Sequence, residues 1–287
     1  MRASGGECRQ VRWGLRWIWG LCLLVAVLLW GAAGTQAGPL LDRMARFPNW
    51  ESKPPVMPAY GDLAYPDWMA GTWKVTSTLV DMVAPLAPAM VSPGFESNRR
   101  YINVPVSFPV RFGPAPARSR RGTMLGVPVP VPVVPANRGL RGKGVPVVAD
   151  RGFNGLSIAR AYLGEGAVKS VKVDPDSPNR QVTLLQSSQL VSTVTGRLSE
   201  RPAADRFVAT EMFVQQFRAG SRVYLNEVET ATAYQKQQQP LPAIEADQVT
   251  AIYLSPQDPD YFAAGGRPVA LYRYRLQFFP ESDGDAS

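Results

Sequence analysis

The chain has 287 residues, of which 45% are hydrophobic and 19% charged, and its formal net charge is +8. This length and composition support one large packed domain or two small ones and exclude wholesale disorder. There is no histidine, and the two cysteines are Cys8 and Cys22. A Ser-His-Asp triad and a zinc or haem site with histidine ligands are therefore excluded.

Residues 1–37 have the pattern of a secretory signal peptide. Four arginines accompany the start of the chain, an apolar run follows at 17–33, and the small residues Thr35 and Ala37 come after it. A basic start, an apolar centre and small residues at positions −3 and −1 predict cleavage after Ala37. An uncleaved membrane anchor is the alternative, because 17 such residues can just span a bilayer. Cleavage would remove both cysteines and leave a chain without thiol or imidazole groups.

The remainder divides into an N-terminal extension, 38–64, a β domain, 65–280, and a tail, 281–287, predicted to be disordered. Helix candidates are 40–46 and a turn near Ala246. Strand-like segments recur between turn residues. They lie at 71–81, 100–112, 153–163, 167–174, 181–186, 189–199, 207–217, 222–234, 249–254 and 268–279.

Short connections between these segments favour an up-and-down antiparallel sheet. An open sheet would leave two exposed edges, which closure removes. The predicted fold class is therefore all-β, with a single antiparallel β-barrel of about 8–10 strands. An N-terminal signal helix precedes this barrel, which would be just wide enough to hold one small ligand.

The positive charge is concentrated in one part of the chain. The leader holds four of the 31 basic residues and one of the 23 acidic ones, so the mature chain would carry +5. Residues 97–149 contain nine basic residues and no acidic one. Within them, 113–149 is predicted to be a Pro/Gly-rich insertion whose Val-Pro alternation favours an extended, polyproline-like path.

Three interpretations of this insertion are open. It could contact an anionic membrane surface, dock on an acidic protein partner, or be a solvated loop without a partner. The basic residues that would make such a contact are Arg118, Arg120, Arg121, Arg138, Arg141 and Lys143. Nucleic acid is not an expected partner, because the insertion has no aromatic residue on which a base could stack.

Gly71 and Trp73 open the first long predicted strand. Gly-x-Trp at this place resembles the lipocalin signature, in which the tryptophan closes one barrel end beneath an arginine of the last strand. This resemblance implies that the predicted barrel is lipocalin-like or calycin-like. Here the last strand offers Arg273 and Arg275, and a guanidinium stacked on an indole ring is a favourable cation–π pair. We therefore predict that Trp73 and one of these arginines close the barrel. Three tyrosines are further candidates for the ligand-binding interior: Tyr224, Tyr272 and Tyr274.

Glu227 and Glu229 share one face of a predicted strand. Paired carboxylates can act as general acid and base or bind a hard cation. The interpretation we favour is a solvent-exposed face, with Tyr224 and Val228 pointing inward, because exposed faces of antiparallel strands are normally polar. No metal ligands are assigned.

Several motifs together resemble a poorly characterised family of cyanobacterial and plant-chloroplast proteins. They are YPDW at 65–68, GTW at 71–73, RRYINVPV at 99–106, PNRQ at 178–181, NEVET at 226–230, YLSPQDP at 253–259 and RPVALY at 267–272. The resemblance covers about 66–279 and implies an oxygenic phototroph and a thylakoid-lumen or periplasmic location, with possible membrane association. It implies no activity and no catalytic residues, and it does not include the basic insertion.

We expect a protein that binds a small apolar ligand such as a lipid, pigment or quinone inside the barrel. One alternative is a non-enzymatic accessory or assembly protein for thylakoid membrane complexes, with the basic insertion as its contact. The other is an enzyme, whose general bases would narrow mainly to Asp, Glu, Lys and Tyr. No catalytic residue and no cofactor are predicted.

Overall fold

The computed structural model describes residues 38–116, 119–124, 127–132, 144–239 and 241–281. These residues belong to the compact unit Gly38–Ser287. The predicted leader, 1–37, and residues 282–287 of the predicted tail lie outside the described residues. Among the described residues, no helix is both long enough and apolar enough to cross a bilayer.

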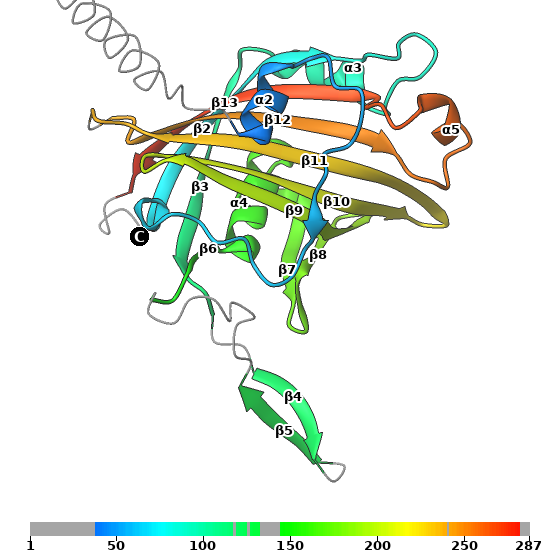
Figure 1. The fold of residues 1–287 in the computed structure, drawn as a ribbon. Helices are drawn as coiled ribbons and strands as arrows, with labels where there is room; N and C mark the ends of the chain where they lie inside the picture. The colour runs from blue at the N-terminus through cyan, green and yellow to red at the C-terminus, as the bar shows by residue number, and fades with distance from the viewer. Residues whose placement is uncertain (1–37, 117–118, 125–126, 133–143, 240, 282–287) are drawn as a thin grey trace, which may run out of the picture. The chain divides into compact units, whose positions relative to one another are not determined.

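Most of the domain is one curled antiparallel sheet (Figure 1). From one end to the other, its strands are β6 (Val147–Ala149), β3 (Pro105–Pro114), β2 (Gly71–Val83), β13 (Ala270–Pro280), β12 (Ile244–Leu254), β11 (Arg222–Lys236), β10 (Arg206–Ala219), β9 (Gln189–Ala203), β8 (Ser177–Leu185) and β7 (Val168–Asp174). A two-residue strand, β1 (Met57–Pro58), also pairs with β9. From β7 to β13 every strand pairs with the next one in the chain, which confirms the predicted up-and-down antiparallel sheet.

The sheet is an open half-barrel, which corrects the prediction of a closed barrel. The first and last long strands, β2 and β13, do pair with each other. The open ends are β6 and β7, and in the described ranges these two strands are not hydrogen-bonded to each other. Helix α4 (Arg151–Leu163) connects them and contacts β3, β7 and β8 on the concave side of the sheet (Figure 1). A helix therefore lies where further strand pairs would have closed the barrel.

The prediction of a strand at 153–163 is wrong, because this segment is most of α4. The carboxylate of Asp150 accepts a hydrogen bond from the backbone nitrogen of Phe153 at 3.0 Å, which caps the first turn. Gly155 lets the helix approach the sheet closely, since a Cβ there would lie 2.7 Å from Nε2 of Gln181. The strand prediction failed because it did not recognise the short strand β6 that ends just before the Asp150 cap, or the helix that begins after this cap and contains Gly155.

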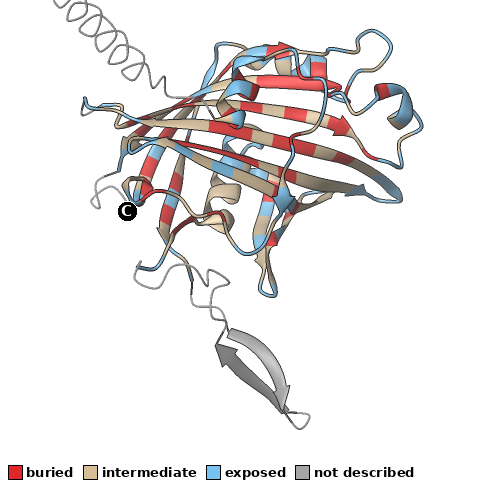
Figure 2. Ribbon diagram, viewed as in Figure 1, coloured by how far each residue is buried: buried red, intermediate tan, exposed pale blue. Residues whose placement is uncertain are grey.

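Both faces of the sheet are covered, as the bands of buried residues in Figure 2 show. The concave face holds an aromatic core that includes Trp73, Phe108, Phe112 and Phe278. The convex face is covered by residues of the N-terminal extension, which pack on strand residues there. The predicted helix at 40–46 is confirmed as α2 (Pro39–Ala45), one of the elements that cover this face.

The remaining helical elements are short. They are α3 (Phe95–Asn98), α5 (Tyr261–Ala264) and the 3-10 turns η1 (Asp67–Met69), η2 (Arg99–Tyr101) and η3 (Glu165–Ala167). The helical turn predicted near Ala246 is wrong, because this residue lies within β12 and pairs with Leu276 of β13.

Part of the basic insertion forms a separate two-stranded antiparallel sheet, β4 (Ser119–Met124) with β5 (Val127–Pro132). The Val-Pro repeat is thus extended, as predicted, but it is paired as a β-strand rather than being an isolated polyproline helix. Prolines alternate with valines along β5, so only every second residue lacks a backbone donor, a pattern that a two-stranded ladder can accommodate.

Candidate functional site

The predicted barrel-closing pair of Trp73 with an arginine is not formed. The indole nitrogen of Trp73 donates to the carbonyl oxygen of Met69 at 2.9 Å, and the ring packs edge-on against Phe278 on the concave face. Arg273 instead forms an ion pair with Asp247 at 2.6 Å and lies over the ring of Phe47. Alternation along β13 places Arg273 and Arg275 on the face opposite Phe278. The lipocalin-like contact therefore fails, because the two partners are on different faces of the sheet.

Two of the three predicted tyrosines, Tyr272 and Tyr274, share one core cluster, whereas Tyr224 is not part of it. Tyr272 is buried beside Phe95, and its hydroxyl accepts a hydrogen bond from Asn98 at 3.3 Å. Tyr274 packs between two core clusters, and burial raises its pKa. Tyr224 lies across the strand pair from Phe217, and burial also raises its pKa.

Glu227 and Glu229 are on the face opposite Val228, as predicted, but this face is not a solvent face. Glu229 is 0% exposed, which corrects the favoured interpretation. Both of its carboxylate oxygens accept hydrogen bonds from the guanidinium of Arg43 at 2.8 Å. The hydroxyl of Tyr253 donates to the same carboxylate at 2.8 Å. Glu227 forms a more exposed ion pair with Lys53 at 2.6 Å.

The physical reason for this burial is the N-terminal extension, which lies over the convex face. The buried ion pair of Arg43 in α2 with Glu229 in β11 joins two parts of the chain 186 residues apart. Both carboxylate oxygens of Glu229 accept hydrogen bonds from Arg43, and Glu227 pairs with Lys53, so the two carboxylates anchor the extension to the sheet. Burial is the main cause that raises the pKa of Tyr253, and the negative charge of Glu229 is the second. The hydroxyl of Tyr253 therefore stays protonated.

The basic residues predicted to contact a partner are only partly within the described chain. Arg120 and Arg121 lie in β4, whereas Arg118, Arg138, Arg141 and Lys143 are outside the described residues.

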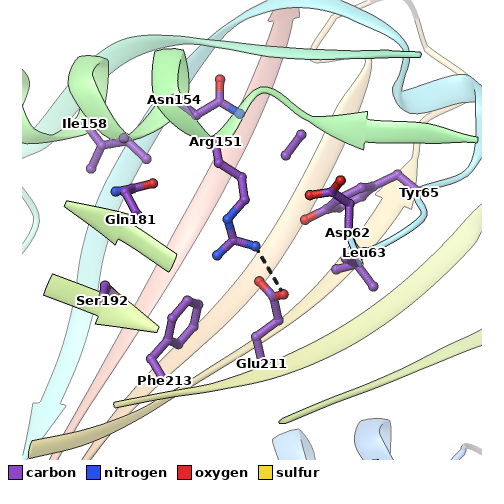
Figure 3. Close-up of a pocket in the computed structure, with 12 residues that line it drawn as sticks. Asp62, Leu63, Tyr65, Arg151, Asn154, Ile158, Gln181, Ser192, Glu211 and Phe213 are labelled. Carbon is purple, nitrogen blue, oxygen red and sulfur yellow. Dashed lines mark hydrogen bonds and ion pairs between the residues drawn. The ribbon is translucent and has the colours of Figure 1, made fainter. Parts of the chain in front are cut away.

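A pocket of about 260 Å³ lies between α4 and the concave face of the sheet (Figure 3). Its wall is formed by the residues before η1, by α4 and by β8, β9 and β10. The lining residues are Asp62, Leu63, Tyr65, Ala149, Arg151, Asn154, Gly155, Ile158, Gln181, Ser192, Glu211 and Phe213. A second hollow of about 480 Å³ shares Asp62, Ala149 and Arg151 with it. Both hollows therefore lie at the opening of the half-barrel.

The polar side of the pocket is organised around Glu211. Its Oε1 lies 2.9 Å from a guanidinium nitrogen of Arg197 and 3.4 Å from one of Arg151. Arg197 also donates to Asn179 and to the carbonyl oxygen of Gly61, both at 2.8 Å. Arg197 is thus held by three groups. The side chain of Arg151 contacts Glu211 and lies 5.9 Å from the centre of the Phe213 ring, and Figure 3 shows this arginine reaching from α4 into the pocket.

The other side of the pocket is apolar. Leu63 and Phe213 lie on the sheet side, and Ile158 of α4 is 39% exposed even though it is a large hydrophobic residue. The hydroxyl of Tyr65 adds a neutral donor, because burial, Tyr234 and Glu211 all raise its pKa. The pocket therefore combines a guanidinium, the two carboxylates of Asp62 and Glu211 and a phenol with an apolar wall.

Comparison of the sequence with models of protein families found a match. The model of the family described as "Domain of unknown function (DUF6816)" matches residues 58–282. The chain belongs to the DUF6816 family. The DUF6816 domain thus begins at β1 and includes the whole pocket, whereas α2 and its Arg43 precede it. Comparison with curated proteins and with solved structures found no match.

The pocket of the DUF6816 domain was not predicted from the sequence, although one signal is visible in β10. Phe207, Ala209, Glu211 and Phe213 alternate on one strand face, and a single carboxylate interrupts an otherwise apolar row. Its partner Arg151 follows the helix cap directly, but a segment read as a strand gave no reason to place it there. Among the described residues, no cluster of three or more carboxylate, thiol or imidazole groups is arranged to hold a metal ion.

Proposed function

We propose that the protein binds a small amphipathic anion in the pocket beneath α4. The observation that carries this proposal is the lining itself, in which Arg151 and Glu211 face the apolar side chains of Leu63, Ile158 and Phe213. Small-molecule sites are typically concave and mostly apolar, with a few polar groups that fix the ligand's orientation. An anionic group would displace part of the long 3.4 Å contact of Arg151 with Glu211.

The volume of the pocket restricts the size of the ligand that can bind there, compared with the lipids, pigments and quinones expected from the sequence. Its volume of about 260 Å³ is at the lower limit for small-molecule sites, which begin at roughly 300 Å³. A long-chain lipid or a pigment could place only a ring or a head group there and would extend into the adjoining hollow. The proposed ligand class is therefore a compact aromatic or aliphatic group that carries a carboxylate, sulfonate or similar anion.

We also propose that the protein is exported and binds this ligand outside the cytoplasm. The leader pattern at 1–37 and the resemblance to thylakoid-associated proteins support a thylakoid-lumen or periplasmic location. Docking of the basic insertion on an anionic membrane or an acidic protein remains a separate proposal, supported only by the charge of 97–149.

Titration with 1-anilinonaphthalene-8-sulfonate, an anion with apolar rings, tests the proposed site. We expect saturable binding by the wild-type chain and about tenfold weaker binding after Arg151→Gln, since hydrogen bonds to charged groups contribute about 1.5–3 kcal/mol. Ser192→Phe should fill the pocket and abolish saturable binding, whereas Ser192→Ala should leave it unchanged. Arg180→Gln is the matched control, because Arg180 pairs with Asp174 on the surface.

Two results would contradict the proposal. One is a wild-type chain that shows no saturable binding, and the other is equal binding by Ser192→Phe and the wild type. Each variant must keep the wild-type melting temperature, because partly unfolded chains also bind this dye.

A further inference from the structure

Gly38, directly before α2, is in close contact with the side chain of Glu200 in β9. One carboxylate oxygen of Glu200, Oε1, accepts a hydrogen bond from the backbone nitrogen of Leu40 at 3.0 Å. A Cβ added to Gly38 would overlap the same carboxylate. Only a glycine leaves room for a carboxylate to pack on its Cα. The backbone nitrogen of Gly38 is one covalent bond from that Cα and lies beside the charge.

The second oxygen of Glu200 differs from the first in its contacts. Oε2 is buried and, among the described residues, accepts no hydrogen bond. Buried polar atoms are nearly always paired, and an ionised oxygen without a donor is costly. Oε2 therefore lacks a donor at the point where the extension begins.

The surrounding contacts hold Gly38 in this place. Leu40 and Met44 are 2% and 4% exposed against the convex face. Arg43 is fixed by Glu229, and the indole of Trp50 donates to the carbonyl oxygen of Arg43 at 2.8 Å. The segment that positions Gly38 is thus anchored independently of Glu200.

The bond before Gly38 is the predicted cleavage site of the leader. We propose that processing between Ala37 and Gly38 creates an α-ammonium group that pairs with the Glu200 carboxylate and completes the docking of the N-terminal extension. A leader endopeptidase would add water across the peptide bond, so the C–N bond breaks, Ala37 gains a carboxylate and Gly38 an amine. This amine is protonated near neutral pH, since the ordinary pKa of an α-amino group is about 8. Oε2 of Glu200 then receives a donor, which it lacks among the described residues.

This inference rests on the predicted leader and the Gly38–Glu200 contact, and it does not depend on the proposed ligand. It also explains the position of the cleavage site in physical terms. A cut one residue earlier would carry the charge beyond Gly38, and a cut one residue later would leave the secondary amine of Pro39 as the terminus and remove the glycine that fits against the carboxylate.

The test begins with the complete chain expressed with its leader in an export-competent bacterium. Intact mass and N-terminal sequencing of the exported protein should give Gly38 as the first residue. The α-amine is then removed by selective transamination with pyridoxal 5′-phosphate, which accepts the amino group and leaves a terminal glyoxylyl aldehyde, and melting curves are recorded before and after. We expect the wild type to lose about 2–4 °C in melting temperature, the shift that accompanies one typical charge-assisted contact in a chain of this size.

Glu200→Gln should melt at the same temperature before and after transamination, because it has no charge to pair with the amine. Glu227→Gln is the matched control: it removes the Lys53 ion pair from the same face and should remain sensitive to transamination. Should Glu200→Gln fail to fold, Glu200→Asp, whose carboxylate is one methylene further from Gly38, should show a reduced shift. A terminus other than Gly38, or an equal loss in the wild type and in each Glu200 variant that folds, would overturn the proposal.

Discussion

The buried ion pair beneath α2 gives the sharpest stability prediction. In the wild type, the guanidinium of Arg43 donates to Glu229, to the hydroxyl of Tyr253 at 3.0 Å and to the carbonyl oxygen of Ser52 at 2.7 Å. Arg43→Met removes all of these donors and leaves the carboxylate of Glu229, which is 0% exposed, without a counter-charge. Breaking a buried pair by removing one partner typically costs about 3–5 kcal/mol.

For a chain of this size each kcal/mol lowers the melting temperature by about 2–4 °C, so Arg43→Met should lower it by roughly 6–20 °C. Thermal and urea unfolding of the protein, followed by far-UV circular dichroism, would measure this loss. Combining Arg43→Met with Glu229→Gln should restore part of it, because no charge is then left buried.

The matched control is Arg273→Met, which breaks the ion pair with Asp247 on the same face. The side chains of this pair are 40% and 38% exposed, so the expected cost is about 0–1 kcal/mol. Equal losses for the two arginine variants would refute the reasoning, since burial of Glu229 is the only basis for the predicted difference.

Three further predictions test other parts of the structure. Gly38→Ala should lower the melting temperature because its Cβ would overlap the Glu200 carboxylate, whereas Gly166→Ala, where the added atom would meet nothing within 4 Å, should not. Burial raises the pKa of Tyr234 to about 12, so the stability that comes from its protonated hydroxyl is complete below pH 10 and is lost as the pH rises from 10 to 12. Tyr234→Phe should reduce the fall of the unfolding free energy over this pH range. An unchanged slope in the variant would contradict the prediction. Glu211→Gln should strengthen binding of anilinonaphthalene sulfonate, because the guanidinium groups of Arg151 and Arg197 lose the carboxylate that they pair with. This effect is opposite to that of Arg151→Gln. Weaker binding by Glu211→Gln would argue against an anion site.

Most of the strands, and which of their residues share a face, could be predicted from alternation, although 153–163 is a helix. Trp73, Val75 and Leu79 are buried on one face of β2, as the pattern indicates. Alternation cannot say what covers the other face, and for this reason Glu229 was assigned to solvent. Its buried partner Arg43 lies 186 residues earlier, in a segment too short to signal a packing role.

The open end of the sheet could not be predicted for a related reason. Asp150 and the two residues that follow, Arg151 and Gly152, allow either a turn into a strand or the first turn of a helix. The hydrogen bond from Phe153 decides between them. Once this segment is a helix, a carboxylate in β10 and an arginine of α4 can meet, and the pocket is a consequence of that meeting. A site between a helix and a sheet depends on tertiary geometry that no local pattern contains.

The pairing of the first long strand with the last one also constrains how the chain folds. β2 has β3 on one side, but its other neighbour is β13, about 190 residues later in the sequence. Contacts between such distant segments slow folding, because much chain entropy is lost before they form. The sheet cannot be completed until the final strand is available, so a chain that is still being synthesised lacks the β2–β13 pairing that completes its core. A C-terminal truncation before β13 is therefore incompatible with the native fold.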